Sequence, residues 1–205
     1  MDFDRRHNFI GNFVYEIPKT HAKGILGQIA DGWQVSGVYR YQSGQPYNVT
    51  VSVPGINSKN FLGTNNTAPP RVVLVGDPGS GHSSDPYRQL NAAAFTIPAV
   101  GTLGLDSGRN FLTTAPTNNW DLSLAKAFYM GGARKLELRV DAFNALNHTQ
   151  FYTLNTSLTV RSLTDPTPTN LPYDANGNIV NPSGFGAVTA VRPPRTLQLQ
   201  ARFLF

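Results

Sequence analysis

The sequence predicts an all-β fold in which about five long strands form an antiparallel meander. Three observations predict it. Side-chain polarity recurs with a period of two, and no window sustains the 3.6-residue period of a helix. Nineteen glycines and 15 prolines divide the 205 residues into short segments. The connections between these segments alternate between short and long, as they do in a sheet whose loops gather at one end.

The five predicted strands alternate apolar and polar side chains. In the fourth, Leu136, Leu138 and Val140 alternate with Lys135, Glu137 and Arg139. Their length fits the roughly 9–11 residues that a tilted strand needs to cross a bilayer. We expect the strands at residues 8–17, 33–51, 120–128, 135–146 and 195–205.

The connections predict an orientation. Residues 18–32 and 129–134 are the short connections, whereas residues 52–119 and 147–194 are long. Outer-membrane barrels have short periplasmic turns and long extracellular loops. We therefore expect the C-terminus in the periplasm and both long loops outside. The first long loop is rich in Pro, Gly, Asn and Ser and is predicted to be irregular, and the second holds a small hairpin turned at Asn176-Gly177.

Composition favours a membrane barrel without deciding the question. Charged residues make up 14% of the chain, against roughly 25% in soluble domains. Hydrophobic residues are 40% and the mean hydropathy is −0.25. Low charge without high hydrophobicity fits strands with one face in lipid and the other on a polar lumen. A soluble all-β binding module of sandwich type, for carbohydrate or adhesion, has a similar composition and remains the alternative.

Two sets of side chains are candidate membrane and lumen sites. Aromatic residues begin or end the apolar faces, as in the girdles at both membrane interfaces of a barrel. We predict a girdle of Trp33, Tyr39, Tyr41, Trp120 and Phe128. On the opposite faces, neighbouring strands bring charges within about 5 Å of one another. We predict a lumen-facing network, structural rather than catalytic, of Asp121, Glu137, Arg139 and Asp141.

Several segments resemble the C-terminal barrel of TonB-dependent receptors, especially the Oar-like branch with an N-terminal carboxypeptidase-regulatory-like domain. Single segments are weakly specific, but their order and spacing are similar to the family over nearly the whole chain. They are Asp4-Arg5-Arg6-His7, Gly32-Trp33-Gln34-Val35-Ser36-Gly37, Ser43-Gly44-Gln45-Pro46-Tyr47, Asn91 to Phe95, Gly108-Arg109-Asn110, Asn119 to Leu124, Phe143-Asn144-Ala145-Leu146-Asn147-His148 and Arg202-Phe203-Leu204-Phe205.

The resemblance implies an outer-membrane transporter of a Gram-negative-type bacterium. It implies a 22-stranded barrel of which this chain supplies the last five strands, forming part of the wall of a substrate uptake pore. It further implies outer-membrane lipid, the remaining strands and plug, and the TonB complex, reached through an N-terminal part, as partners. The terminal Phe205, with Phe203, resembles the signal that the barrel assembly machinery reads. Residues 1–7 contain no apolar signal-peptide core, which indicates either an intracellular protein or a chain without its N-terminal part. Because five strands cannot close a barrel, we expect a fragment of a longer receptor or a chain that depends on further strands.

The sequence predicts no enzyme and no cofactor or metal. The absence of cysteine excludes thiolate chemistry, and scattered basic residues disfavour nucleic acid. His7, His21, His82 and His148 lie in separate segments without metal-ligand spacing. Residues 72–83 resemble a strand and P-loop, but His82 stands where the phosphate-binding lysine belongs, which leaves nucleotide binding a minor alternative. Residues 174–178 resemble a calcium loop without its final Glu, so a turn is favoured.

Overall fold

A computed structural model describes residues 4–20, 22–57, 61–63, 69–80 and 82–205. The chain forms two compact units. The sheet unit consists of Arg5–Ser43, Pro116–Gln150 and Arg192–Phe205, and the loop unit consists mainly of Gly44–Ala115 and Phe151–Val191. Among the described residues, the structure has no helix with the length and apolar character required to cross a bilayer.

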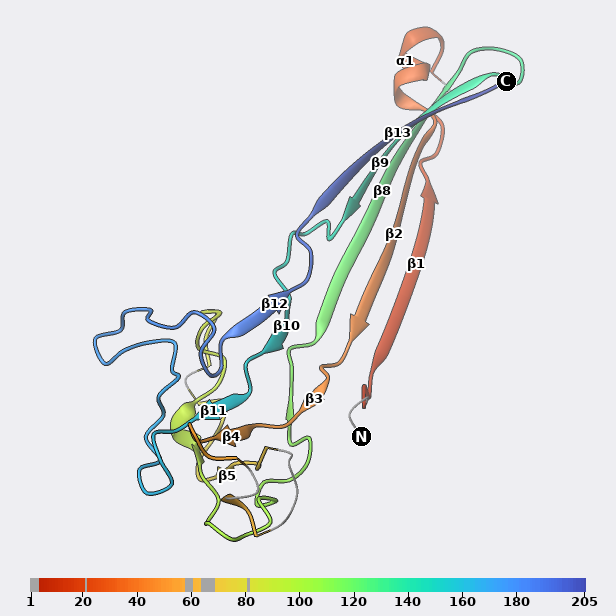
Figure 1. Ribbon diagram of the computed structural model, residues 1–205. Helices are drawn as coiled ribbons and strands as arrows, with labels where there is room; N and C mark the ends of the chain where they lie inside the picture. The colour runs from red at the N-terminus through yellow and green to blue at the C-terminus, as the bar shows by residue number, and fades with distance from the viewer. Residues whose placement is uncertain (1–3, 21, 58–60, 64–68, 81) are drawn as a thin grey trace. The chain divides into compact units, whose positions relative to one another are not determined.

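The sheet unit is built on one five-stranded antiparallel sheet (Figure 1). Each long strand pairs with the next long strand along the chain, so the order is that of a meander. The all-β class with an antiparallel sheet is confirmed. The strands are β1 (Asn8–Glu16), β2 (Trp33–Gln42), β8 (Thr117–Tyr129), β9 (Lys135–Phe143) and β13 (Thr196–Leu204).

The predicted second strand, residues 33–51, is too long. β2 ends at Gln42, and residues 46–52 belong to the loop unit. The chain leaves the sheet at Gly44, where a Cβ atom would lie 1.8 Å from the carbonyl oxygen of Thr114. Only glycine fits so close a backbone approach. The fourth strand also ends earlier than residue 146, because Asn144 adopts a left-handed φ of 50° after Phe143.

The strand register gives the sheet two chemically different faces. Directly paired residues lie on the same face. One row across the five strands reads Phe13, Gly37, Leu122, Ala142 and Leu197. The next row, on the opposite face, reads Val14, Ser36, Ser123, Asp141 and Gln198. The period-two patterns of the separate strands therefore combine into one apolar and one polar face.

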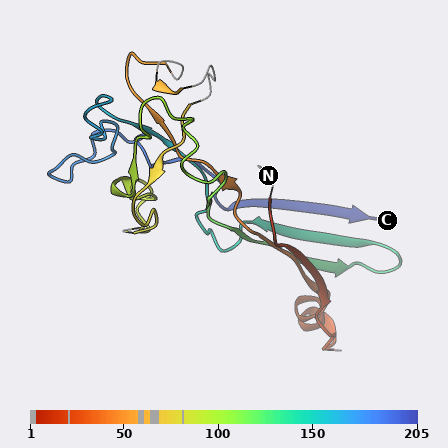
Figure 2. The ribbon, with the colours of Figure 1, turned by 90° about the horizontal axis from the view of Figure 1, so that it is seen from below.

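The short connections lie at one end of the sheet, which we call the short-turn end. The β8–β9 turn closes there through residues 130–134, where the Met130 N–H bonds the Arg134 carbonyl at 3.0 Å. The β1–β2 connection contains the helix α1 (Gly24–Ala30). Figures 1 and 2 show α1 and the C-terminus at this end, with β13 at one edge of the sheet and β1 at the other.

The loop unit has its own short strands and helical turn. β4 and β11 pair in parallel, and the pairs β3–β7, β5–β6 and β10–β12 are antiparallel. The elements are β3 (Pro46–Tyr47), β4 (Thr50–Ser52), β5 (Val73–Leu74), η1 (Ala92–Ala94), β6 (Phe95–Thr96), β7 (Leu112–Thr113), β10 (Phe151–Leu154), β11 (Ser157–Thr159) and β12 (Val188–Val191).

The two long connections share a hydrophobic core, although their backbone is irregular over most of its described length. Because β2 ends at Gln42, the first connection begins earlier than residue 52 and contributes Val49, Val51 and Phe95 to this core. The second connection contributes Leu158 and Phe185. Burying apolar surface from both segments offsets the entropy of ordering them. The small hairpin near Asn176 is present: Tyr173 pairs with Ile179, and Gly177 has a φ of 83°.

Candidate functional site

The side chains on the apolar face of the sheet are not covered by other described residues of the sheet unit. Phe9, Phe13, Leu124, Leu197 and Leu199 all lie on it with large exposed side-chain areas, and Leu199 is 79% exposed. In a soluble sandwich a second sheet would cover such a face. None of the sheets formed by the described residues of the sheet unit does so. This face is suited to contact with lipid.

All five predicted girdle residues lie on this face, in two groups. Tyr39, Tyr41 and Trp120 lie toward the end of the sheet that joins the long connections, with the Tyr39 and Trp120 rings 4.6 Å apart. Trp33 and Phe128 lie at the short-turn end. Trp120 and Phe128 are eight residues apart on β8, or about 26 Å along the strand. With a tilt of about 40°, that separation spans most of an apolar band about 25 Å tall. The girdle assignment itself stays a prediction.

The four predicted lumen charges share the polar face but do not form one network among the described residues. Arg139 donates to Asp141 at 2.8 Å and to the Ser123 hydroxyl at 3.0 Å, and Ser123 in turn donates to Asp141. This cluster joins β8 to β9. Sequence reasoning did not single out Ser123, whose signal is its position directly opposite Asp141.

The other two predicted charges have separate partners. Asp121 accepts from the Asn119 side chain at 2.8 Å and from the Asn144 N–H at 2.9 Å, which fixes the chain where it leaves β9. Glu137 pairs with Lys135 at 3.5 Å. Separation follows from the strand spacing: residues on one face of a strand recur about every 6.6 Å, so each carboxylate bonds the nearest polar group. Sequence reasoning did not predict Asn119 and Asn144 as the partners of Asp121.

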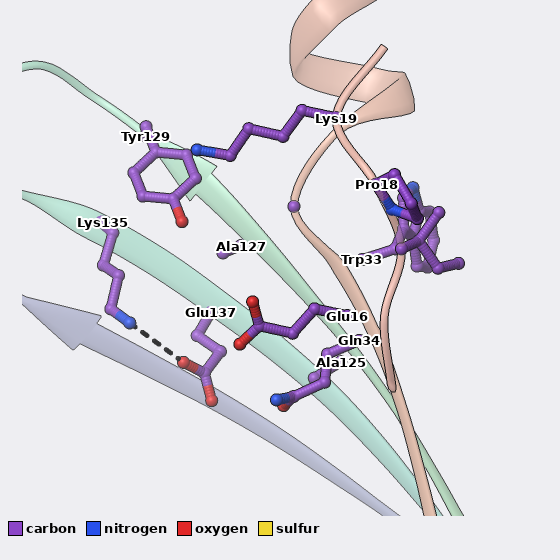
Figure 3. A pocket seen from close by; sticks show the side chains of 12 residues that line it. Glu16, Pro18, Lys19, Trp33, Gln34, Ala125, Ala127, Tyr129, Lys135 and Glu137 are labelled. Atoms are coloured by element: carbon purple, nitrogen blue, oxygen red, sulfur yellow. Dashed lines mark hydrogen bonds and ion pairs between the residues drawn. The ribbon is translucent and has the colours of Figure 1, made fainter. Parts of the chain in front are cut away.

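A hollow of about 330 Å³ lies on the polar face at the short-turn end (Figure 3). Glu16, Gln34 and Glu137 point into it from three strands, and Lys19 and Lys135 border it. The Lys19 ammonium also lies 5.8 Å from the centre of the Tyr129 ring. The mixed charges suit polar ligands and water. Among the described residues, no group of three or more His, Asp or Glu side chains is arranged to hold a metal ion.

The C-terminal aromatic pair is exposed. The Phe203 and Phe205 rings stack with their centres 6.2 Å apart, and Phe205 is the most exposed large apolar residue of the sheet unit. Phe203 lies on the apolar face opposite Leu136. The role of this pair as an assembly signal stays a prediction.

Lys126 is a feature that the sequence pattern did not reveal. It lies on the apolar face of β8, directly opposite Trp33, yet it is only 5% exposed. Its ammonium lies 5.2 Å from the centre of the Trp33 ring and 5.1 Å from that of Phe128, and it donates to the Asp31 carbonyl. The two rings and the carbonyl replace water around the charge.

The sequence segments that resembled other sites fold as loop structure. His82 bonds the Gln89 side chain at 2.9 Å, and the described residues after it form turns rather than the helix that a P-loop requires. Gly81 and His21 lie outside the described residues. The Asp174 carboxylate accepts from the backbone N–H groups of Asn176 and Asn178 at 2.9 and 2.8 Å, which makes it a turn-forming residue.

The loop unit holds one compact cluster of aromatic and charged side chains. The Tyr173 hydroxyl donates to Asp85 at 2.5 Å, and the Arg88 guanidinium lies 4.3 Å from the centre of the Tyr173 ring. The Tyr173 hydrogen bond, the Tyr87 N–H and the Arg88 charge together hold the pKa of Asp85 below its usual range. The cluster ties residues 85–88 of one long connection to the hairpin of the other.

Replacing Tyr173 with phenylalanine should weaken the loop unit at neutral pH but not in acid. A lowered folded-state pKa stabilises the fold above the ordinary Asp pKa of about 3.9, and this contribution is lost as pH falls through the folded-state value. We expect a lower urea midpoint for Tyr173→Phe at pH 7 and a difference that shrinks below about pH 4. A fluorophore on a cysteine introduced at the exposed Asn176 would report the midpoint.

Tyr87→Phe is the matched control, because it removes a neighbouring hydroxyl and leaves the bond between Tyr173 and Asp85 in place. This control should keep the pH dependence of the parent protein. If the urea midpoints of Tyr173→Phe and the parent differ by the same amount at both pH values, the Tyr173 hydrogen bond does not act through the ionisation of Asp85.

Comparison with known proteins identifies the family. A family model described as the outer membrane beta barrel domain matches residues 1–198. Searches of curated proteins and of solved structures gave no match. The match agrees with a sheet that has one exposed apolar and one polar face, and it confirms the predicted outer-membrane location. The match does not support the alternative of a soluble sandwich module. The chain belongs to the outer membrane beta barrel domain family.

Proposed function

We propose that this chain forms part of the wall of a TonB-dependent outer-membrane receptor that takes up a substrate. The observation that carries the proposal is the strand register, which collects the charged groups of β8 and β9 on one face and leaves the other face apolar. In a barrel the polar face lines the lumen, where a plug or a substrate is bound. The chain contributes contact surface and no catalytic group.

The family resemblance adds the transporter class. Several of the segments that resemble TonB-dependent receptors lie at the ends of the long strands, where they fix the backbone conformation. Gly32 has a φ of 81°, and a Cβ there would lie 2.6 Å from the Ala127 carbonyl oxygen. Asn144 bonds the His148 backbone, and its amide also donates to the Pro193 carbonyl at 3.3 Å. Gly32 and Asn144 thus fix the backbone at two strand ends of this sheet.

Further strands must complete the wall. β1 and β13 are the two edges of the described sheet. Each unpaired backbone group in lipid costs several kcal/mol, so an open edge does not persist in a bilayer. The smallest bacterial barrels have about eight strands, so five cannot close. We infer that β1 and β13 pair with other strands of a 22-stranded barrel, and that its plug and the TonB complex complete the transporter.

Channel conductance tests the proposal and requires no identified substrate. The protein is expressed from its own reading frame into the outer membrane, purified and inserted into planar bilayers. A receptor with a plug should conduct little until urea unfolds the plug, and should then show large, reversible conductance. High conductance without urea would indicate an open porin and would contradict the receptor. Absence of conductance both with and without urea would contradict a pore formed by a 22-stranded barrel.

A further inference from the structure

The helix α1 exposes three large apolar side chains at the short-turn end of the sheet. Ile25, Leu26 and Ile29 are 78%, 73% and 59% exposed. At 100° per residue, they lie within one arc of about 100° on the helix surface. The opposite side of α1 is packed, because Gly27 is buried against the backbone of Ala22. The exposed side chains are therefore not needed to hold the helix in place.

Polar contacts hold α1 to the apolar side of the sheet. The Trp33 indole donates to the Ile29 carbonyl at 2.8 Å, and the Lys126 ammonium donates to the Asp31 carbonyl. Both Trp33 and Lys126 belong to the apolar face. The Asp31 carboxylate also accepts from the Thr20 N–H at 2.6 Å, which closes the base of the connection. The C-terminal end of α1 is thus fixed beside the face that meets lipid.

The same residues locate the boundary of the bilayer. A lysine on a lipid-facing surface directs its ammonium to the polar boundary, and tryptophan is enriched at that level. Lys126, Trp33 and the Phe128 ring meet beside the C-terminal end of α1. Residues 17–30 contain two lysines, Lys19 and Lys23, and no acidic residue, a charge that suits the phosphates of lipid headgroups.

We propose that α1 is an interfacial anchor whose Ile25, Leu26 and Ile29 side chains insert at the boundary between headgroups and acyl chains. These side chains contact the phospholipid leaflet at the short-turn end of the sheet. The surface is continuous with the lipid-facing side of the sheet through Trp33. Amphipathic helices that lie in the membrane interface bury their apolar face about 5–10 Å into the boundary region. The inference rests on the outer-membrane barrel and does not depend on transport.

Depth-dependent fluorescence quenching tests the anchor. These 205 residues contain no cysteine, so a single cysteine can be placed on the apolar arc at Leu26 and labelled with an environment-sensitive fluorophore. Gln28→Cys is the matched control, because Gln28 is exposed on the same helix outside the apolar arc. The full protein is reconstituted in vesicles of phosphatidylethanolamine and phosphatidylglycerol, with and without acyl chains brominated near the headgroup. Heat-dependent gel mobility identifies the folded barrel.

An anchor in lipid predicts blue-shifted emission at position 26 and quenching by brominated chains about two-fold or more stronger than at position 28. Equal quenching at the two positions would overturn the proposal. Blue-shifted emission at position 26 without quenching would overturn it as well, because the helix would then be covered by protein, such as another part of the receptor or a second copy.

Discussion

Replacing Leu199 with arginine should destabilise the folded barrel by about 2–4 kcal/mol, the cost of a cationic side chain on the lipid face near the bilayer midplane. Leu199 lies in the middle of β13 and pairs with Val140, and its side chain is 79% exposed in the described structure. In water such a position would accept arginine at almost no cost. A large effect therefore requires that the surroundings of this face be lipid.

Gln198→Arg is the control, since it places the same side chain on the adjacent residue of the same strand. Gln198 lies on the polar face directly opposite Asp141, where a guanidinium meets water and a carboxylate. Its substitution should change stability by less than about 1 kcal/mol. Guanidinium unfolding in lipid vesicles, followed by tryptophan fluorescence, would measure both. If both arginines are tolerated equally, the apolar face does not contact lipid.

The sequence predicted the sheet because its evidence is local. A strand buried or lipid-covered on one side alternates with a period of two, and this pattern can be read within β1, β9 and β13 alone. The two faces of the sheet then follow, because strand pairing places apolar residues beside apolar residues and polar residues beside polar ones. The charges on the polar face were predicted for the same reason. Their individual partners were not, because Ser123 and Asn144 meet the carboxylates only when strand register and strand ends are known.

The second strand shows the limit of periodicity. Tyr47, Val49 and Val51 continue the alternation of β2, but Val49 and Val51 are fully buried in the loop unit. A period of two reveals that one side of a segment is covered, and it does not reveal what covers it. Lys126 is the opposite case: its apolar-face position conflicts with its charge until Trp33 from β2 and Asp31 from the connection are brought beside it.

The loop unit was not predicted, because its core is assembled from residues distant in the chain. Phe61, Phe95, Leu158 and Phe185 lie in short apolar segments separated by stretches of turn-forming residues, and Val72 begins the apolar run of residues 72–75. No local period marks them, and each gains burial only when the two long connections fold together. β4 and β11, which pair in parallel across more than 100 residues of chain, are of this kind. Such long-range pairings lie outside what propensity and turn chemistry can predict.

A shared core predicts that damage at one side chain spreads to both connections. Phe185 is 2% exposed and packs edge-to-face against Phe95, with the ring centres 5.6 Å apart. Phe185→Ala should cost the loop unit about 3–5 kcal/mol, from lost burial and the cavity that remains. We expect amide hydrogen exchange to become faster at Val49–Val53 as well as at Leu158–Val160, while the β8 and β9 strands keep their protection.

Ile179→Ala provides the comparison within the same connection, since Ile179 is 49% exposed in the hairpin and lies outside the core. It should cost less than about 1 kcal/mol and leave exchange at Val49–Val53 unchanged. Faster exchange confined to the neighbourhood of Phe185 would show that each connection is ordered separately. Faster exchange in both connections would show that the two long loops fold as one cooperative unit, in which a single buried ring orders segments more than 100 residues apart.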